Sequence, residues 1–309
     1  MFTLVCALWL GSEAGPNEAL AVTAKSLEDR VRVEVNGELF TEIRMRGDSK
    51  TFLYPILGPG QTHLTRRWPE EKVDGEEQDH PHHRGLWFAH GAVDGHDFWT
   101  GENGASRITN VEVVSLETKD GIAVVKTRGA WLHGEEKLLR EEREYTFRAT
   151  PEERFLDLQI TLTAEKDITF GDTKEGTMAL RIAETLRLKG EHATGRARNS
   201  EGVEGAEIWG KRARFVDYSG KVGDTSYGVA VFDHPTSFRH PTWWHARDYG
   251  LLAANPFGVH DFERKPAGSG DEKLLEGKSL TFRYRFVFYR GTRSLAELEA
   301  FEPRAASGK

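Results

Sequence analysis

The chain has 309 residues, of which 38% are hydrophobic and 10% aromatic, so it can bury a substantial core and does not have the composition of a disordered segment. Its 42 basic and 49 acidic residues give a net charge of −7 without any basic run, which argues against nucleic acid and anionic membranes as partners. The single cysteine, Cys6, excludes a disulfide framework within the chain and a cysteine-based metal site.

The N-terminal segment has the features of a targeting sequence. Residues 2–10 are apolar and are followed by small residues, as in the core and cleavage region of a secretory signal. The usual positive charge before the core is missing, and a buried first strand is the alternative interpretation. The apolar run is too short to span a bilayer. We therefore predict a leader over residues 1–22, a single domain over 23–309, and a secreted or periplasmic protein with no membrane span.

Alternation with a period of two dominates from about residue 30 onward. Apolar and charged residues alternate over 30–35, and Asn36-Gly37, a strong hairpin signal, separates this run from a second strand over 39–45. The runs 155–164 and 280–290 are apolar on one face and polar on the other, as half-buried antiparallel strands are. Further strand-like runs lie at 107–116, 121–132, 138–148, 177–188 and 227–233.

Helix is scarce in this pattern. The one convincing helix is expected over 294–301, where Ser294 and Glu297 have the spacing of a capping box. The polar stretches 69–78 and 265–273 are expected to be solvated loops, and neither has the composition of a domain linker. The sequence therefore predicts an all-β fold, a large antiparallel β-sandwich with few short helices.

Histidines gather in two segments. The segment 79–90 (DHPHHRGLWFAH) carries four of them, and the segment 233–249 carries three more beside two tryptophans. Histidine supplies acid–base capacity near neutral pH, tryptophan offers flat faces that stack on sugars, and arginine offers fixed donors for hydroxyls or carboxylates. Any one of these residues alone is more often structural than functional. Four histidines so close together are costly to bury without partners, so their density predicts a binding or catalytic site.

Two further segments carry candidate groups. Residues 171–178 join two predicted strands and present Asp172 and Glu175 between glycines. A carboxylate that faces histidines can act as a general base or orient an imidazole, whereas the alternative is an ordinary charged hairpin. Residues 250–258 are interpreted as an apolar turn that forms a pocket wall, with Asn255 placed to bind a hydroxyl.

A metal site is the next candidate. His80 and His82 are two residues apart, so in an extended segment they point the same way and form a ligand pair, which His90, His240 or His245 could complete. The sequence has no HExxH motif, and the case for a divalent metal cofactor therefore rests on the spacing of these histidines alone. The sequence also lacks a G-x-S-x-G elbow, a Walker A loop and a dinucleotide-binding glycine motif.

Several of these motifs together resemble one bacterial family. They are the runs 54–60 (YPILGPG), 65–66 (TR), 79–87 (DHPHHRGLW), 174–176 (KEG) and 240–250. The pattern covers nearly the whole predicted domain and resembles a family with the historical label "methane oxygenase PmoA", although the chain has no membrane helix of the kind a membrane-embedded monooxygenase subunit needs. The resemblance implies a galactose-mutarotase-like supersandwich, a fold that hosts epimerases, glycoside hydrolases and polysaccharide lyases. It supplies no catalytic residues.

The leading hypothesis is an exported carbohydrate-active enzyme that cleaves or rearranges a glycosidic linkage by acid–base chemistry, with an oligosaccharide or glycoside as partner. Either His82 or His83 would be the general acid and Glu175 the base. The full set of candidate catalytic residues is His82, His83, Glu175, His240 and His245. The candidate substrate-binding residues, among which Trp87 and Trp243 would stack on the sugar, are Arg66, His80, Arg84, Trp87, His90, Asp172, Trp243, Asp248 and Asn255. A non-catalytic sugar-binding module and a metal-dependent oxidoreductase are the alternatives, and hydrolysis, elimination and epimerisation all stay open.

Overall fold

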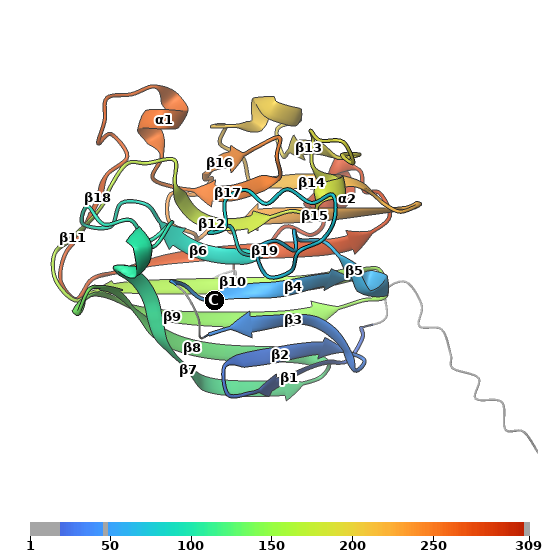
Figure 1. Cartoon of the computed structure of the whole chain (residues 1–309), viewed down its shortest axis with the longest axis horizontal. Coiled ribbons are helices and arrows are strands. Elements are labelled where there is room, and N and C mark those ends of the chain that lie inside the picture. Colours follow the sequence, from blue (N-terminus) through green and yellow to red (C-terminus); the bar gives the residue numbers. More distant parts are fainter. Residues whose placement is uncertain (1–18, 46–48, 306–309) are drawn as a thin grey trace, which may run out of the picture.

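Two antiparallel β-sheets pack face to face in the computed structural model, which describes residues 19–45 and 49–305 (Figure 1). Within these ranges the first sheet has nine strands in the order β1-β2-β3-β4-β6-β12-β17-β16, with β5 beside β4. Its strands are β1 (Val22–Ser26), β2 (Arg30–Val35), β3 (Glu38–Arg44), β4 (Phe52–Gly58), β5 (Thr62–His63), β6 (Leu86–His90), β12 (Gly176–Arg181), β16 (Trp243–Ala246) and β17 (Leu251–Asn255).

The second sheet has eight strands among the described residues, in the order β13-β14-β15-β19-β10-β9-β8-β7. These are β7 (Ser106–Lys119), β8 (Ile122–His133), β9 (Glu136–Ala149), β10 (Glu153–Ala164), β13 (Arg196–Asn199), β14 (Phe215–Val222), β15 (Thr225–Asp233) and β19 (Ser279–Arg290). A small separate ladder joins β11 (Ile168–Phe170) to β18 (Glu272–Leu274). The predicted all-β antiparallel sandwich is therefore confirmed.

Helical structure is short. The two α-helices of the described chain are α1 (Val259–Glu263) and α2 (Leu295–Glu299), and its 3₁₀ turns are η1 (Pro59–Gln61), η2 (Glu102–Gly104), η3 (Glu184–Leu186) and η4 (Gly205–Ile208). The predicted capping box is present at α2, where Ser294 and Glu297 each bond the other's backbone N–H. Helix α1 was not predicted. Among the described residues no helix has the length and apolar character needed to cross a membrane.

Two predicted elements are wrong in extent or type. The run 177–188 forms a strand only as far as Arg181, where β12 gives way to a loop and then to η3. The predicted apolar turn over 250–258 is mostly strand β17, whose five residues are all buried. The predicted leader lies largely outside the described residues, and β1 begins at Val22, inside the range 1–22.

The core lies between the two sheets and determines which side chains of β6 face outward. Phe88 of β6 packs on Trp131 of β8 and Phe282 of β19, with ring centroids 6.0 and 5.1 Å apart. Because side chains alternate along a strand, Trp87 points to the opposite face. Burial of each such aromatic ring stabilises the fold by roughly 1.5–3 kcal/mol, which fixes the register of β6.

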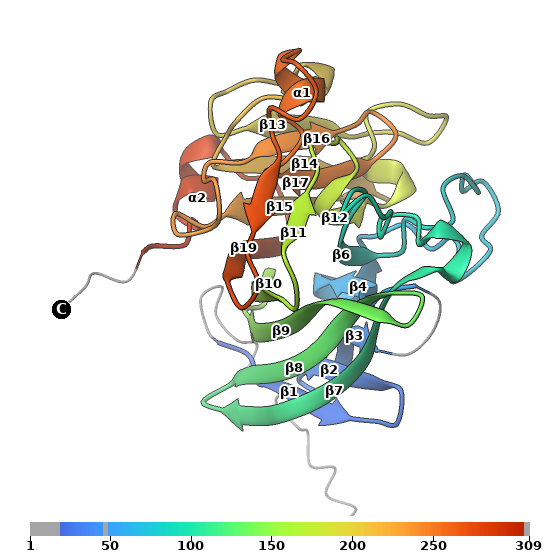
Figure 2. The ribbon, with the colours of Figure 1, turned by 90° about the vertical axis from the view of Figure 1, so that its left-hand side faces the viewer.

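The outward face of the nine-stranded sheet carries a row of paired residues. Trp87 pairs with Ala179, Ala179 with Ala253, and Ala253 with His245, across β6, β12, β17 and β16. Directly opposed residues of antiparallel strands share a face, so this row runs from a tryptophan to a histidine over two small side chains. The segments before and after β6 project on this side, away from β10 and β19 (Figure 2).

Candidate functional site

A buried ion network anchors the histidine segment to the outward face of the sheet. Both oxygens of the Asp79 carboxylate accept bonds from Nη2 of Arg181, at 2.9 and 3.1 Å, and one also accepts a bond from Arg66. The two guanidinium side chains are 0% and 1% exposed. Burial raises the pKa of Asp79, but the arginine charges and the bond from His80 Nδ1 lower it by a larger amount. The pKa of Asp79 therefore lies below its ordinary value. The carboxylate is therefore an ionised anchor.

Four aromatic rings stack on this anchor. Tyr249 lies 5.4 Å from His80, His80 lies 4.7 Å from His83, and His83 lies 5.2 Å from Trp87, measured between ring centroids, with the planes within 20° of parallel. His82 stands edge-on beside this stack, 4.4 Å from His83. The rings come from two segments far apart in the sequence, and they form one continuous surface from the buried tryptophan to the half-buried tyrosine.

His83 is held as a neutral ring inside the stack. Its Nδ1 lies 3.2 Å from Nη1 of Arg181, and because a guanidinium can only donate, Nδ1 is the acceptor. Burial, the neighbouring His82 and the Arg181 charge all lower the pKa of His83 far below its ordinary value. A ring fixed in the neutral form is poorly suited to the general-acid role predicted for it, and its contacts are those of a positioning residue.

His82 is more accessible than His83, the other candidate for the general acid. Burial, the Lys50 ammonium and His80 lower the pKa of His82 to about 4, while the Glu175 and Asp97 carboxylates act in the opposite direction. At neutral pH its imidazole is therefore uncharged, and it can accept a proton. This reverses the predicted direction of proton transfer at His82, from general acid to general base.

Lys50 supplies the positive charge beneath this group. Its side chain is buried, its Nζ donates to the carbonyl of Trp99, and it lies 5.8 Å from the ring of Trp87. Burial lowers the pKa of Lys50 to about 7, although the Asp97 charge opposes the shift. Lys50 was not among the predicted residues, because no sequence pattern around it marks a buried lysine.

Glu175 approaches the ring stack from the loop before β12. Its negative charge raises the pKa values of His82, His245 and Tyr249, so the carboxylate lies within electrostatic range of all three groups. The carboxylate is partly exposed and pairs with Nζ of Lys174 at 3.0 Å. Nδ1 of His245 lies 2.9 Å from the Lys174 carbonyl, which can only accept, so Nδ1 carries the proton and Nε2 is left as an acceptor.

His240 and His90 belong to other networks. Nδ1 of His240 lies 2.9 Å from the Asp233 carboxylate at the end of β15. His90 is fully buried, with Nε2 2.8 Å from the Gly171 carbonyl and its ring against Phe257. Neither histidine makes a ring contact or hydrogen bond with the stack, so the structure gives them no part in the arrangement around His82.

Asp172 and Asn255 shape the loop that carries Glu175. The Asp172 carboxylate accepts backbone N–H groups of His260 and Gly270 at 2.7–3.0 Å. The Asn255 amide donates to the Thr173 carbonyl at 2.8 Å and accepts the N–H of Phe257 at 2.8 Å. The polar groups that were expected to bind substrate hydroxyls are thus engaged in holding the backbone.

The tryptophans predicted to stack on a sugar are covered. Trp87 is 0% and Trp243 7% exposed. Trp87 is covered by His83, Trp99 and Lys50. Trp243 is covered by Arg212 and the Glu263 carboxylate. The sugar-stacking role is therefore wrong for this conformation, because alternation along each strand places both indoles under other side chains. The exposed ring of the site is His80, with 43% of its side chain accessible.

The remaining candidates lie at the margins. Arg84 packs over the ring of Phe52, with its guanidinium carbon 4.3 Å from the centroid, and pairs with Glu70. The backbone carbonyl of Asp248 accepts the N–H groups of Leu188 and Lys189. Arg181, which joins the anchor to His83, was not among the predicted residues. The signal for it was a lone charge at the end of the apolar run GTMALR.

The predicted metal pair is not completed. His80 lies in a turn, with φ of 42°, rather than in an extended segment, and its Nδ1 is 2.6 Å from Asp79. In residues 19–45 and 49–305, His80 and His82 belong to no group of three histidine, cysteine or carboxylate side chains with ligand atoms within 4.8 Å of one another.

Solved structures with similar chain paths have very low sequence identity. A galactose mutarotase-like protein from Clostridium acetobutylicum matches with a TM-score of 0.44 and 9% identity, over 89% of this chain and 100% of that one. A GH36 alpha-galactosidase from Geobacillus stearothermophilus matches with a TM-score of 0.42 and 8% identity, over 89% of this chain and 41% of that one. A heparan sulfate lyase from Pedobacter heparinus matches with a TM-score of 0.39 and 9% identity, over 90% of this chain and 38% of that one. This chain thus spans only about two fifths of the last two proteins.

One family profile matches most of this chain. No curated protein matches the chain. The profile, described as "Family of unknown function (DUF6807)", matches residues 30–301. The resemblance to the family labelled "methane oxygenase PmoA" stays a prediction.

Proposed function

The chain belongs to the DUF6807 family, and from its own site we propose that it is an exported carbohydrate-active enzyme that moves a proton on a glycoside by histidine and carboxylate chemistry. The observation that carries the proposal is the packing of His82 and Tyr249, from separate segments, on the ring of His80, within electrostatic range of the Glu175 carboxylate. Titratable groups with shifted pKa values that gather from distant segments are typical of catalytic sites.

His82 is the proton acceptor in this proposal. Its uncharged imidazole takes a proton from the sugar, and the Glu175 carboxylate stabilises the imidazolium that forms. Burial raises the pKa of the Tyr249 phenol, which therefore keeps its proton at neutral pH and can give it to the departing or ring oxygen. The stacked, fixed ring of His83 and the Asp79 anchor hold these groups in place.

Carboxylates are few around the stack, and this favours proton transfer by histidine over hydrolysis by two carboxylates. Asp79 is occupied by two arginines and His80. The Asp97 carboxylate accepts the backbone N–H groups of Trp99 and Thr100 at 2.8 and 3.0 Å. Glu175 is left as the partly exposed carboxylate within electrostatic range of the histidines, so elimination or epimerisation fits the arrangement better than a two-carboxylate mechanism.

The proposal is tested with a panel of oligosaccharides and glycosides, including oxidised (keto) glycosides, with product masses recorded in the presence and absence of chelator. His82→Gln and Glu175→Gln keep similar shapes and remove the proton acceptor and the charge. We expect each to lose at least about 100-fold in kcat/KM while glycan binding changes little, because these groups act chiefly in the transition state. His192→Gln, at an exposed loop residue, is the matched control and should keep wild-type turnover.

Other outcomes assign the protein differently. Full turnover by both variants would contradict the roles given to His82 and Glu175. A wild-type protein that binds glycans and converts none of the panel would be a sugar-binding module. Turnover with a change of oxidation state, abolished by chelator and restored by one metal, would identify a metal-dependent oxidoreductase.

A further inference from the structure

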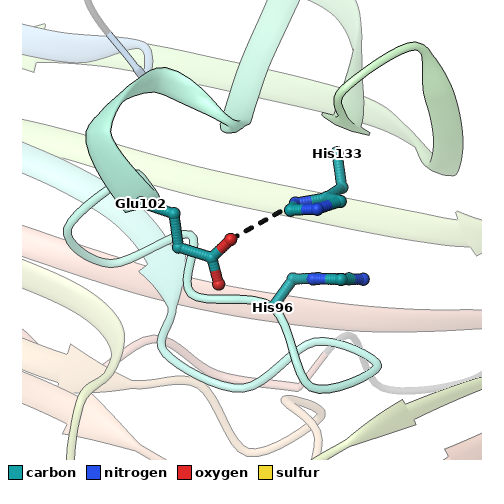
Figure 3. Close-up of side chains that lie close together, drawn as sticks. All are labelled: His96, Glu102 and His133. Carbon is teal, nitrogen blue, oxygen red and sulfur yellow. Dashed lines mark ion pairs between the residues drawn. The ribbon is translucent and has the colours of Figure 1, made fainter.

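A second group of ligand-type side chains lies where the loop after β6 meets the other sheet. His96 belongs to that loop, Glu102 begins the 3₁₀ turn η2, and His133 is the last residue of β8. Their ligand atoms all lie within 4.8 Å of one another, the one such group of three among the described residues. Figure 3 shows the Glu102 carboxylate directed at the His133 ring, with the His96 ring lying beside both. The proposed proton transfer uses none of these residues.

The imidazole rings of His96 and His133 are stacked face to face. Their centroids are 3.5 Å apart and their planes are within 14° of parallel. Glu102 Oε2 is 3.3 Å from Nδ1 of His133, and the side chains of both are about a third exposed. Two imidazoles and a carboxylate this close together can offer ligand atoms to one metal ion. A cation from solvent can reach them.

Neighbouring groups hold Glu102 and His133 in position. The N–H of Asp97 donates to Oε1 of Glu102 at 2.5 Å, which leaves Oε2 on the side of the histidines. Glu102 adopts a φ of 44°, a left-handed conformation that few residues other than glycine take. The Ser106 hydroxyl lies 3.2 Å from Nδ1 of His133. Such outer contacts orient ligands in established metal sites and are needed for full affinity.

We propose that His96, Glu102 and His133 bind one divalent transition-metal ion of the zinc class. Two imidazoles and one carboxylate are ligands that zinc and its neighbours in the first transition row prefer, whereas calcium and magnesium prefer oxygen ligands alone. Three protein ligands leave a coordination position for water. The site is distinct from the predicted pair of His80 and His82.

The ion would tie the loop after β6 to strand β8 of the opposite sheet. Trp99, three residues beyond His96, packs against His83 at 5.7 Å and against Trp87 at 5.2 Å between ring centroids. A metal at this position would therefore act as a positioning element for the ring stack, without contact with a substrate. The inference does not rest on the proposed reaction, because it concerns the ligand geometry alone.

The test is metal binding by the full-length, tag-free protein after treatment with chelator. Isothermal titration with Zn²⁺, Mn²⁺, Ni²⁺ and Co²⁺ gives stoichiometry and affinity, and visible absorption of the Co²⁺ form reports nitrogen and oxygen ligation. We expect one ion per chain, with Zn²⁺ bound more tightly than Mn²⁺. His133→Ala and Glu102→Gln should each weaken Zn²⁺ binding by at least about 100-fold, since they remove ligands rather than outer contacts. His192→Ala, at an exposed position outside the group, should bind like the wild type.

Thermal unfolding provides an independent readout. Zn²⁺ should raise the unfolding temperature of the wild type and of His192→Ala, and should not raise that of the ligand variants, because an ion that binds only the folded state stabilises it. Circular dichroism identifies a variant that has failed to fold. If His133→Ala fails to fold, the nearly isosteric Glu102→Gln still tests the loss of a ligand. Failure of the wild type to bind any of the four ions, or equal Zn²⁺ binding by wild type and ligand variants, would overturn the inference.

Discussion

Asp79→Asn removes the charge from the anchor of the histidine segment and keeps the size of the side chain. Arg66 and Arg181 would then be left with 1% and 0% exposed guanidinium groups and no carboxylate between them. Removing one partner of a fully buried ion pair costs about 3–5 kcal/mol. Asp79 itself is 32% exposed, so water screens part of this loss, and we expect a decrease of about 2–3 kcal/mol in the free energy of unfolding.

The pH dependence of this loss is a sharper test than its size. The pKa of Asp79 is lowered in the folded state, so its contribution to stability is fully present above the ordinary aspartate value of about 3.9 and is lost as the pH falls through the folded value. The stability difference between wild type and Asp79→Asn should therefore stay constant from about pH 7 to 5 and shrink below about pH 4.

Urea unfolding followed by circular dichroism at a series of pH values measures both quantities. Near neutral pH the variant should also unfold about 3–5 °C below the wild type. Asp224→Asn is the control, because Asp224 is exposed in the turn between β14 and β15 and should change stability by less than about 0.5 kcal/mol. If Asp79→Asn matched this control, or if its deficit persisted unchanged at pH 3, the anchor would not have the role assigned to it.

Two further predictions concern proton transfer and export. If neutral His82 accepts the proton, the acid limb of kcat/KM should lie near pH 4, because a protonated imidazole cannot accept a proton. Lys50→Met should move this limb to higher pH, because it removes a positive charge that lowers the pKa of His82. A limb near pH 6.5 that is unchanged in the variant would contradict this assignment. If the chain is exported, mass spectrometry of the exported protein should place its first residue after residue 10 and no later than Leu20. The leader would then be shorter than the predicted 1–22, because the N–H of Leu20 bonds to the Ala149 carbonyl and β1 begins at Val22. The presence of residues 2–10 in the exported protein would contradict processing.

Strands with one wet face could be predicted from the sequence alone. The alternation over 30–35 corresponds to β2, and Asn36 and Gly37, with φ of 50° and 84°, form the expected hairpin turn to β3. The run 155–164 lies within β10, whose pairing with β19 puts Leu158 opposite Tyr284 on the core side. Each of these signals is local, because a half-buried strand shows its own period in its own residues.

Strands buried on both faces gave no such signal. All five residues of β6 and all five of β17 are buried, so neither shows alternation, and the second was interpreted as a turn. A short, wholly apolar run is equally compatible with a turn under side chains and with a strand covered on both sides. The choice between turn and strand depends on which side chains pack on the outward face. Those side chains come from other segments, as when the ring of His83 packs on Trp87.

The same limit applied to the site. The density of histidines correctly placed His80, His82 and His83 in one cluster, because the segment is continuous. It could not show that Arg181 lies beneath them, nor that Tyr249 extends the stack, since both depend on sheet register. Residue types also could not distinguish histidines that hold backbone from those that face solvent.

Burial sets the direction of the chemistry at this site. Burial lowers the pKa values of His82 and His83, so these two adjacent imidazoles are uncharged at neutral pH. Burial, the Lys50 charge and His80 lower the pKa of His82, and the Glu175 carboxylate acts in the opposite direction, so Glu175 favours the protonated ring. The Asp79 anchor holds the segment whose burial lowers the pKa of His82, so weakening the anchor should alter both stability and the pH profile.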